Sequence, residues 1–429
     1  MIKKEIIGVG FGPSNLATAV SLVENDFHST LFLEKKERFS WFPGMMLKRS
    51  RLQNSCLKDL VLVANPRSRF TFLNYLFEKK ILDDFINLNN LYPEREDVNN
   101  YMFWVSSQLN KYIQYSSCVS AITPHSTDLD CMQNLKVSYT DMHGKFAELI
   151  CENIVIGTGA APFLPTSILP HPRATHTVNA VQFLGNLNKE QHHHFLVIGG
   201  SQSSAEILYH ILELFPYSQI QVVSKGFIFR SLEASALINR MFSEYGMSWF
   251  GCYPRSAQKN IYQDLLTANY SAVDPDLIQM ISEILYFDKK RGRSRVTFHH
   301  YHELIDIVDH QDTFTCKLRC TLTNTEKNVH GSQLIFATGF SYRNTLKLLE
   351  PVEKWLVYDK EGIPIRNSDY SLKTHPNFLP KIFVHSVGDA TFGLTEGGMT
   401  NLAVRGRRMM QSMQQKRVAL RRKDAPVTG

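Results

Sequence analysis

The N-terminal segment Glu5-Ile6-Ile7-Gly8-Val9-Gly10-Phe11-Gly12-Pro13-Ser14 joins a short apolar strand to a glycine-rich turn. Apolar and small residues then recur at helical spacing through Val23, and a second apolar strand, 30–33, ends at Glu34. Glycine has no Cβ, so backbone N–H groups and the positive end of a helix can approach a pyrophosphate closely. Strand, turn, helix, strand and acid in this order predict a dinucleotide-binding βαβ unit.

Within this turn Gly8 and Gly10 permit the close approach, whereas the third glycine of the usual G-x-G-x-x-G pattern is replaced by Pro13. Proline is tolerated in the first turn of a helix, because its missing N–H would have no helical partner there. Glu34 ends the second strand, where an acid can accept hydrogen bonds from ribose hydroxyls. These features favour nucleotide binding over a purely structural glycine turn.

A second unit of the same kind begins later in the chain. The buried strand 195–198 leads into Gly199-Gly200-Ser201-Gln202-Ser203-Ser204, a helix follows, and the next strand, 220–223, ends at Ser224-Lys225 with no acid. Lysine attracts a 2′-phosphate that an acid would repel, and Arg230 can add a second positive contact, so this unit favours NADPH over NADH. Two nucleotide folds that differ in this way imply a hydride relay from a nicotinamide to a flavin.

The expected fold is α/β, with two Rossmann-like dinucleotide-binding domains, for FAD and for NADPH, and a small, mostly helical substrate-binding region. The first part of the FAD-binding domain is expected over residues 1–165, with a substrate-region insert at about 42–100. The NADPH-binding domain is expected over 190–332, with a helical substrate-region insert at about 232–290. The second part of the FAD-binding domain, with a C-terminal helix, is expected over 333–429.

The composition is that of a globular protein. The 429 residues include 47 lysines and arginines and 40 aspartates and glutamates, a net charge of +7, and 43% are hydrophobic, which excludes a disordered or collagen-like chain. The basic residues near the C-terminus are expected on a solvated helix face rather than on a nucleic-acid or membrane surface. No apolar run reaches the ~18–20 residues that cross a bilayer, and the N-terminus lacks the pattern of a signal peptide.

Seven cysteines without C-x-x-C spacing indicate a reduced, cytoplasmic protein with no disulfide framework. The missing C-x-x-C also argues against a flavin disulfide reductase. The runs His192-His193-His194 and His299-His300 are expected to be solvated, because consecutive strand residues point to opposite faces and no carboxylate or cysteine cluster accompanies them. We therefore expect no metal site.

A more specific pattern lies between the two turns. It consists of Phe39-Ser40-Trp41-Phe42-Pro43-Gly44-Met45, Gln53-Asn54-Ser55-Cys56-Leu57-Lys58-Asp59-Leu60-Val61, Pro66-Arg67-Ser68 and Phe70-Thr71-Phe72-Leu73-Asn74-Tyr75-Leu76. In these segments, and over nearly its whole length, the chain resembles the N-hydroxylating flavoprotein monooxygenases, the L-ornithine N5- and L-lysine N6-hydroxylases of siderophore biosynthesis. The resemblance implies that a C4a-hydroperoxyflavin, formed with FAD, NADPH and O2, hydroxylates a neutral primary amine in a closed pocket. It also implies a homo-oligomer, commonly a tetramer.

The two turns and the resemblance together give the expected site residues. For FAD they are Gly8, Gly10, Gly12, Pro13, Glu34, Trp41 and Gln53. Asp389 is added because Gly388-Asp389 resembles the Gly-Asp that holds the flavin ribityl chain in other flavoproteins with two nucleotide folds. For NADPH they are Gly199, Ser201, Gln202, Ser203, Lys225 and Arg230. For the substrate they are Lys58, which would meet a carboxylate, Asn239, Asn269 and Thr400. The expected catalytic residues are Asn269 and Gln53.

Several positions depart from the family pattern around the expected substrate site. Phe42 stands where His is frequent, Arg240 stands where an acid is frequent, and the usual H-G-L-[ST]-[DE]-x-L-L-S pattern is changed over 392–400. Lys58 argues for a substrate with a carboxylate, L-ornithine or L-lysine, whereas the changed surroundings leave histamine, putrescine or cadaverine as alternatives. A non-catalytic protein that binds flavin and NADP is the alternative of a different class.

Overall fold

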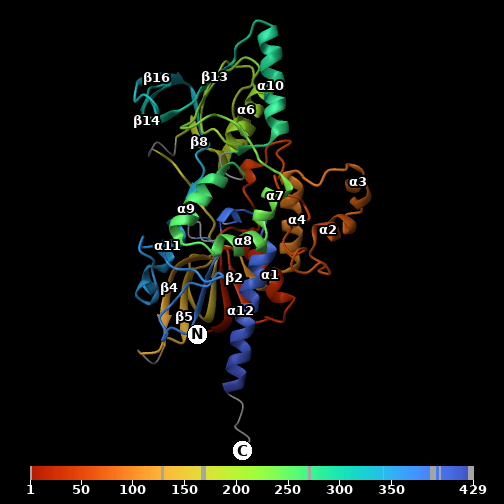
Figure 1. Ribbon diagram of the computed structural model, residues 1–429, viewed down its shortest axis with the longest axis vertical. Helices are drawn as coiled ribbons and strands as arrows, with labels where there is room; N and C mark the ends of the chain where they lie inside the picture. The colour runs from red at the N-terminus through yellow and green to blue at the C-terminus, as the bar shows by residue number, and fades with distance from the viewer. Residues whose placement is uncertain are drawn as a thin grey trace, which may run out of the picture.

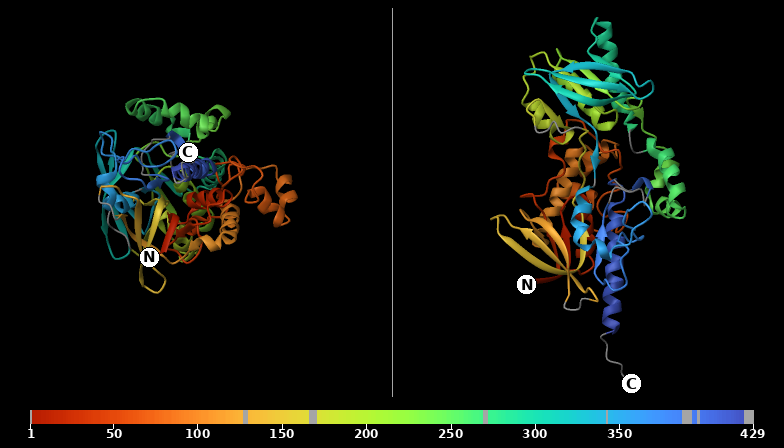
Figure 2. Two further views of the ribbon diagram at one scale, coloured as in Figure 1. Left: turned by 90° about the horizontal axis from the view of Figure 1, so that it is seen from below. Right: turned by 90° about the vertical axis from the view of Figure 1, so that its left-hand side faces the viewer.

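The computed structural model describes residues 2–126, 130–165, 171–268, 272–341, 343–386, 393–395 and 398–423. Two sheets, one in the lower half of Figure 1 and one in its upper half, are each covered by helices. A small antiparallel sheet flanks the upper sheet (Figure 2, right). Its strands are β14 (His302–Asp309), β15 (Phe314–Cys320) and β16 (Glu326–Gly331).

The lower sheet, within the described residues, has seven strands. They are β1 (Ile2–Val9), β2 (Thr30–Leu33), β3 (Ile113–Gln114), β4 (Cys118–His125), β5 (Asn134–Thr140), β6 (Phe146–Ile156) and β19 (Lys381–Val384). Their order is β3-β2-β1-β6-β5-β4, with β19 parallel to the second half of β6. The register aligns Val9 with Leu33 and Ile156, so the carboxyl ends of parallel strands meet at one edge, where α/β proteins bind nucleotides.

The upper sheet is parallel throughout, in the order β13-β10-β9-β17-β8. Its strands are β8 (Ala174–His176), β9 (His194–Ile198), β10 (Gln219–Val223), β13 (Val296–His299) and β17 (Gln333–Phe336). The sheet therefore includes β8, which lies before the expected start of this domain at 190, and β17, which lies after its expected end at 332. Strand β17 is buried along its whole length. Such an apolar run fits the centre of either sheet, so its sequence does not reveal which sheet it joins.

Helices α1 (Pro13–Val23) and α12 (Leu402–Lys423) lie side by side on the lower sheet (Figure 1). They approach closely at Gly406, where a Cβ would lie 2.9 Å from the carbonyl oxygen of Ala17. Helix α4 (Arg95–Gln108) packs against α1. The upper sheet is covered by α6 (Gln202–Leu214) and α10 (Pro275–Lys290), which contact each other.

Of the two expected inserts, most of the first, at 42–100, is irregular, whereas the second, at 232–290, is mostly helical. The first holds α2 (Phe72–Glu78) and α3 (Leu82–Asn87), which project from the body (Figure 2, left). The second holds α7 (Ala236–Asn239), α8 (Glu244–Gly251) and α9 (Arg255–Asp264). The remaining helices are α5 (Ala180–Gly185) and α11 (Arg343–Leu349). None of the helices in the described part of the chain combines the length and apolar character that spanning a bilayer requires.

Candidate functional site

The first glycine turn has the backbone geometry that a dinucleotide needs. Gly10 has a φ of +80°, and a Cβ on it would lie 2.5 Å from the carbonyl oxygen of Gly157. Helix α1 begins at Pro13, and its N-cap is Gly12, which has no side chain to cap the first turn. Backbone N–H groups at this turn can therefore bind an anion, so the turn fits the pyrophosphate of the expected FAD. Gly8 lies before the turn, in β1, where a Cβ would lie 2.0 Å from the ring of Phe32.

Glu34 lies beside this turn and is buried, with 7% of its surface exposed. Its Oε2 accepts a 2.5 Å hydrogen bond from the backbone N–H of Phe11, and its Oε1 accepts a 3.0 Å hydrogen bond from the N–H of Lys36. Each carboxylate oxygen can accept more than one hydrogen bond. The position therefore remains compatible with the predicted role of Glu34 as a ribose partner.

The loop that begins at Trp41 lies between α4 and the connections that follow β8 and β17. The backbone N–H of Trp41 donates to Asn99 Oδ1 of α4 at 3.3 Å. Phe42 has a φ of +42°, and its ring lies 5.3 Å from that of Phe340. A Cβ on Gly44 would lie 1.9 Å from a carbonyl oxygen after β8. Phe42, which stands where the family often has histidine, thus packs its ring against Phe340, which follows strand β17 of the upper sheet.

The second glycine turn has similar geometry. Gly199 has a φ of +146°, and a Cβ on it would lie 2.4 Å from the carbonyl oxygen of Ala337. Ser201 is the N-cap of α6, and it makes no side-chain capping bond. Gln202 and Ser203 form the first turn of the helix. This helix end can therefore receive a second pyrophosphate, which fits the expected NADPH.

The strand after this helix ends beside an acid that the sequence did not suggest. Lys225 Nζ lies 3.3 Å from Oε2 of Glu303, which β14 brings to the end of β10. Hydrogen bonds from Arg319 and Lys225 lower the pKa of Glu303. Arg230 is exposed in β11 (Arg230–Ser231), which pairs with β12 (Ala272–Val273). The predicted contact of Lys225 and Arg230 with a 2′-phosphate stays a prediction.

A cavity of about 650 Å³ brings together three of the predicted site residues, Gln53, Gln202 and Asn239. Gln53 Nε2 donates to Gln202 Oε1 at 3.2 Å, and the same oxygen accepts from the backbone N–H of Asp274 at 2.9 Å. Asp274 is the N-cap of α10. Asn239 is exposed at the end of α7, with its Nδ2 hydrogen-bonded to the carbonyl oxygen of Ala234. The cavity thus joins residues expected at the flavin, the nicotinamide and the substrate.

A buried ion pair fixes this arrangement. Glu206 of α6 is 4% exposed and accepts hydrogen bonds of 2.8 and 2.9 Å from the guanidinium of Arg95 in α4. Gln202 Nε2 also donates to Glu206, at 2.8 Å. Burial raises the pKa of Glu206, and the charge of Arg95 opposes that rise. The pair connects the helix of the second turn to the helix that supports the Trp41 loop.

Lys58 does not line this cavity. It lies half-buried at a neighbouring cavity of about 20 Å³, and burial lowers the pKa of its ammonium group. Asn54 lines both cavities, and its Oδ1 accepts a 3.0 Å hydrogen bond from the hydroxyl of Thr400. Asn54 therefore connects the main cavity with Lys58 and Thr400, although it was not among the predicted site residues.

Asn269 and Asp389 lie outside the described residues, so their expected contacts with substrate and FAD remain predictions. The histidine runs need a correction. His193 is 6% exposed and hydrogen-bonds the carbonyl oxygen of Asn188, and His299 is 9% exposed, so these two are buried rather than solvated. His193 directly precedes β9 and His299 ends β13, and the side chain of each is turned into the protein interior. No cluster of metal-ligating side chains occurs in the described parts of the chain.

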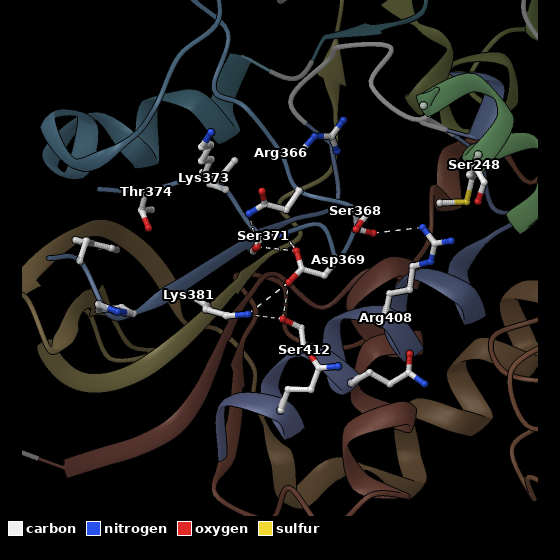
Figure 3. Close-up of a pocket in the computed structure, with 18 of the residues that line it drawn as sticks. Ser248, Arg366, Ser368, Asp369, Ser371, Lys373, Thr374, Lys381, Arg408 and Ser412 are labelled. Atoms are coloured by element: carbon white, nitrogen blue, oxygen red, sulfur yellow. Dashed lines mark hydrogen bonds and ion pairs between the residues drawn. The ribbon is translucent and has the colours of Figure 1, made fainter. Parts of the chain in front are cut away.

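Another cavity, of about 1140 Å³, opens between α8, α12 and the segment 366–381 (Figure 3). Within it Asp369 accepts hydrogen bonds from Ser371 and Ser412 and pairs with Lys381 at 3.5 Å. None of the predicted site residues in the described regions lines this groove. Its only carboxylate in those regions is already satisfied, and both glycine turns open elsewhere, so we assign the chemistry to the 650 Å³ cavity.

Comparisons with known proteins agree with this geometry. The sequence model of the family described as L-lysine 6-monooxygenase/L-ornithine 5-monooxygenase matches residues 3–342. The L-ornithine N(5)-monooxygenase of Burkholderia cepacia is 30% identical over 398 residues, which cover 91% of this chain and 89% of that protein. The ornithine N-hydroxylase of Kutzneria sp. 744, solved with reduced FAD, NADP+ and L-ornithine, superposes with a TM-score of 0.91 and 25% identity over 97% of this chain and 100% of that one.

The ornithine hydroxylase of Pseudomonas aeruginosa superposes with a TM-score of 0.89 and 27% identity, and the match covers 96% of this chain and 99% of that one. These matches extend along nearly the whole chain and confirm both the resemblance and the expected α/β fold with two dinucleotide-binding domains. The chain belongs to the L-lysine 6-monooxygenase/L-ornithine 5-monooxygenase family.

Proposed function

We propose that this monooxygenase uses FAD, NADPH and O2 to hydroxylate the side-chain amine of L-ornithine, with L-lysine as the second choice, for siderophore biosynthesis. The observation that carries the proposal is the hydrogen bond between Gln53 and Gln202. It joins the segment expected at the flavin to the first turn of the helix expected at NADPH, inside one cavity. A hydride donor and its acceptor must meet at such a junction.

When bound, FAD reduced by NADPH supplies the activation of O2, and amine, O2, NADPH and a proton give N-hydroxyamine, water and NADP+. The residues of the chain position the substrate and exclude water. An alkylammonium of pKa about 10.4 must lose its proton before its nitrogen can react. A cavity that removes it from water favours the neutral amine, so no side-chain nucleophile is needed.

The half-buried cation of Lys58 supports a substrate that carries a carboxylate, whereas the main cavity is lined by both signs of charge. Its cations are the exposed Lys48, Arg49 and Arg51, and its carboxylates are those of Glu94, Glu206, Glu233, Asp274 and Asp276. In the neighbouring cavity the half-buried Lys58 makes no ion pair with any described residue, and burial lowers its pKa. A substrate carboxylate would relieve this cost, because a partly buried ammonium gains most from an opposite charge. A diamine such as putrescine or cadaverine offers no such group.

The proposal is tested by product analysis of the purified protein with FAD, NADPH and air. L-ornithine, L-lysine, putrescine, cadaverine and histamine are supplied separately, and hydroxylamine is measured with NADPH consumption. We expect hydroxylamine from L-ornithine in preference to each decarboxylated amine. Preferential turnover of histamine or of a diamine would contradict the carboxylate requirement. FAD binding without amine-stimulated NADPH oxidation would support the non-catalytic alternative instead.

We further propose that the enzyme works in the cytoplasm as a homo-oligomer, with a tetramer expected from the family. All seven cysteines, each in a described region, are free, which suits a reducing compartment. The projecting segment 77–92 supports self-association, because Phe77, Ile86 and Leu88 are 67%, 61% and 71% exposed. Lys79 and Lys80 lie near Asp83 and Asp84 in this segment, so opposite charges can meet across a two-fold interface, in which the same patch of both subunits is in contact.

A further inference from the structure

His385 occupies a buried position at the nucleotide-binding edge of the lower sheet. It directly follows β19, and its backbone N–H donates to the carbonyl oxygen of Ile156, the last residue of β6, at 3.3 Å. The residue is 5% exposed. It therefore lies where β1 and β6 end and where the first glycine turn begins, although it is separated from that turn by most of the chain.

The imidazole of His385 contacts α1 through Nε2, which lies 2.9 Å from Asn15 Oδ1 and 3.5 Å from Thr18 Oγ1. The amide nitrogen of Asn15 is used elsewhere, as a donor to backbone carbonyls, and the hydroxyl of Thr18 donates to Ser14. Both oxygens that face His385 are therefore acceptors. This hydrogen-bond network assigns the proton to Nε2, so His385 is the donor in both contacts.

Neighbouring groups fix the protonation state of His385. Its carbonyl oxygen accepts from Arg366 Nη1 at 3.4 Å. Burial, together with the nearby Arg405 and Arg366 guanidinium groups, holds the pKa of His385 well below its usual value. The ring is therefore neutral at physiological pH and keeps a single N–H donor, which points at α1.

Asn15 transmits this contact to the glycine turn. Its Nδ2 donates to the carbonyl oxygens of Val9 at 3.1 Å and Gly10 at 2.6 Å. Its side chain also packs against Gly157, where a Cβ would lie 2.7 Å from the amide. If the Asn15 amide were rotated by half a turn, its oxygen would face two carbonyl oxygens. A hydrogen bond from His385 to Oδ1 prevents that rotation.

We propose that His385 is a positioning residue for FAD, which fixes the amide of Asn15 so that Asn15 holds the Val9–Gly10 peptide in the conformation that receives the pyrophosphate. The inference rests on the FAD site included in the proposed function. It assigns to a residue on the last strand of the lower sheet a role in the turn at the start of the chain. His385 acts through Asn15 and has no part in the oxygen chemistry.

The test measures the dissociation constant of FAD by fluorescence titration of the apoprotein, with thermal unfolding measured alongside. His385→Leu keeps most of the side-chain volume and removes the donor. We expect it to weaken FAD binding about tenfold, since a buried acceptor left unsatisfied costs about 1–3 kcal/mol and each 1.4 kcal/mol is tenfold. His385→Gln offers an N–H donor and should restore FAD affinity to within about threefold of wild type.

The matched control is His193→Leu. His193 is similarly buried, at 6% exposure, but directly precedes β9 of the upper sheet, with its Nε2 against the carbonyl oxygen of Asn188. It should lower the melting temperature without weakening FAD binding. NADP+ binding should be unchanged in the His385 variants. Wild-type FAD affinity in His385→Leu, or no recovery in His385→Gln, would overturn the proposal.

A double variant tests whether His385 acts through Asn15. In an Asn15→Ala background, the change His385→Leu should weaken FAD binding no further. A full additional loss would mean that His385 acts by another route and would overturn the inference. If His385→Leu gives no folded protein, Asn15→Ala alone should show the same loss of FAD affinity, and wild-type affinity in that variant would overturn it. A wild-type protein that binds no FAD would instead contradict the proposed function.

Discussion

Lys58 is the residue on which substrate choice depends most directly. We expect Lys58→Met to raise the KM for L-ornithine about tenfold or more, because a charge-assisted hydrogen bond contributes about 1.5–3 kcal/mol. The kcat and the KM for NADPH should change little. Steady-state kinetics of amine-dependent NADPH oxidation check this, with Lys145→Met, a change on an exposed hairpin, as the control. An unchanged KM for L-ornithine would remove Lys58 from the substrate site.

His299 shows how one buried histidine makes stability depend on pH. Its Nε2 lies 2.9 Å from Gln221 Oε1, and its Nδ1 lies 3.0 Å from Lys327 Nζ, so the ring is neutral with its proton on Nε2. Burial and the positive charge of Lys327 lower the pKa of His299 to about 4. The unfolded chain, with a histidine pKa near 6.5, therefore binds a proton before the folded chain does as the pH falls.

The contribution of His299 to the free energy of unfolding is thus fully present above about pH 6.5 and is lost as the pH falls toward 4. The variant His299→Gln has no titrating group at this position. Between pH 7 and pH 5 its free energy of unfolding should therefore fall by about 2 kcal/mol less than that of the wild type. Urea unfolding at pH 7 and pH 5 measures the difference. Equal pH dependence in the wild type and the variant would show that His299 does not titrate in this way.

At the scale of elements, the Arg95–Glu206 pair joins α4 to α6 across the site. We expect Arg95→Leu to lower the free energy of unfolding by about 3–5 kcal/mol, because it leaves a buried carboxylate without its partner. Changing both residues, Arg95→Leu with Glu206→Leu, should recover part of that loss. Lys317→Met is the control, because the pair of Lys317 with Glu326 is 44% and 43% exposed and contributes at most about 1 kcal/mol.

Chemical denaturation measures these differences in the free energy of unfolding. An Arg95→Leu protein as stable as the Lys317→Met protein would show that the buried pair does not hold the two helices together.

The projecting segment 77–92 is the surface through which we expect the protein to self-associate. Phe77→Glu combined with Leu88→Glu places charges at the centre of the exposed apolar surface, so it should reduce the oligomer to a smaller species. Sedimentation velocity measures the change. Met142→Glu is the matched control, since Met142 is also 71% exposed but lies on the β5–β6 hairpin. An oligomer unaffected by the double change, or a monomeric wild type, would contradict the assignment of this surface.

At the scale of the whole molecule, the sequence predicted what is local along the chain. Both βαβ units could be identified because glycine turns, helix periodicity and flanking strands lie within short segments. The sheet to which 333–336 belongs could not be predicted, because a buried apolar strand looks the same in either sheet. The approach of Glu303 to Lys225 could not be predicted either, because it depends on how the small sheet packs against β10.

The same reasoning applies to the site. Gln53 and Gln202 were expected at different cofactors, and the structure brings them into one cavity. The contacts of Arg95 with Glu206 and of His385 with Asn15 connect residues from distant parts of the chain. No local spacing signals such pairs. A charged residue among apolar neighbours, as Glu206 is between Ala205 and Ile207 in α6, is the one sequence signal that could have drawn attention to the first of them.

The most direct test of the proposed chemistry follows the oxygen atom. The purified protein is supplied with FAD, NADPH, L-ornithine and isotopically heavy O2, and the product is analysed by mass spectrometry with parallel measurement of NADPH consumption. We predict N-hydroxyornithine that carries one heavy oxygen, formed in near-equal amount to the NADPH consumed. NADPH oxidation that yields only hydrogen peroxide, or a hydroxylated product without the heavy isotope, would contradict the account.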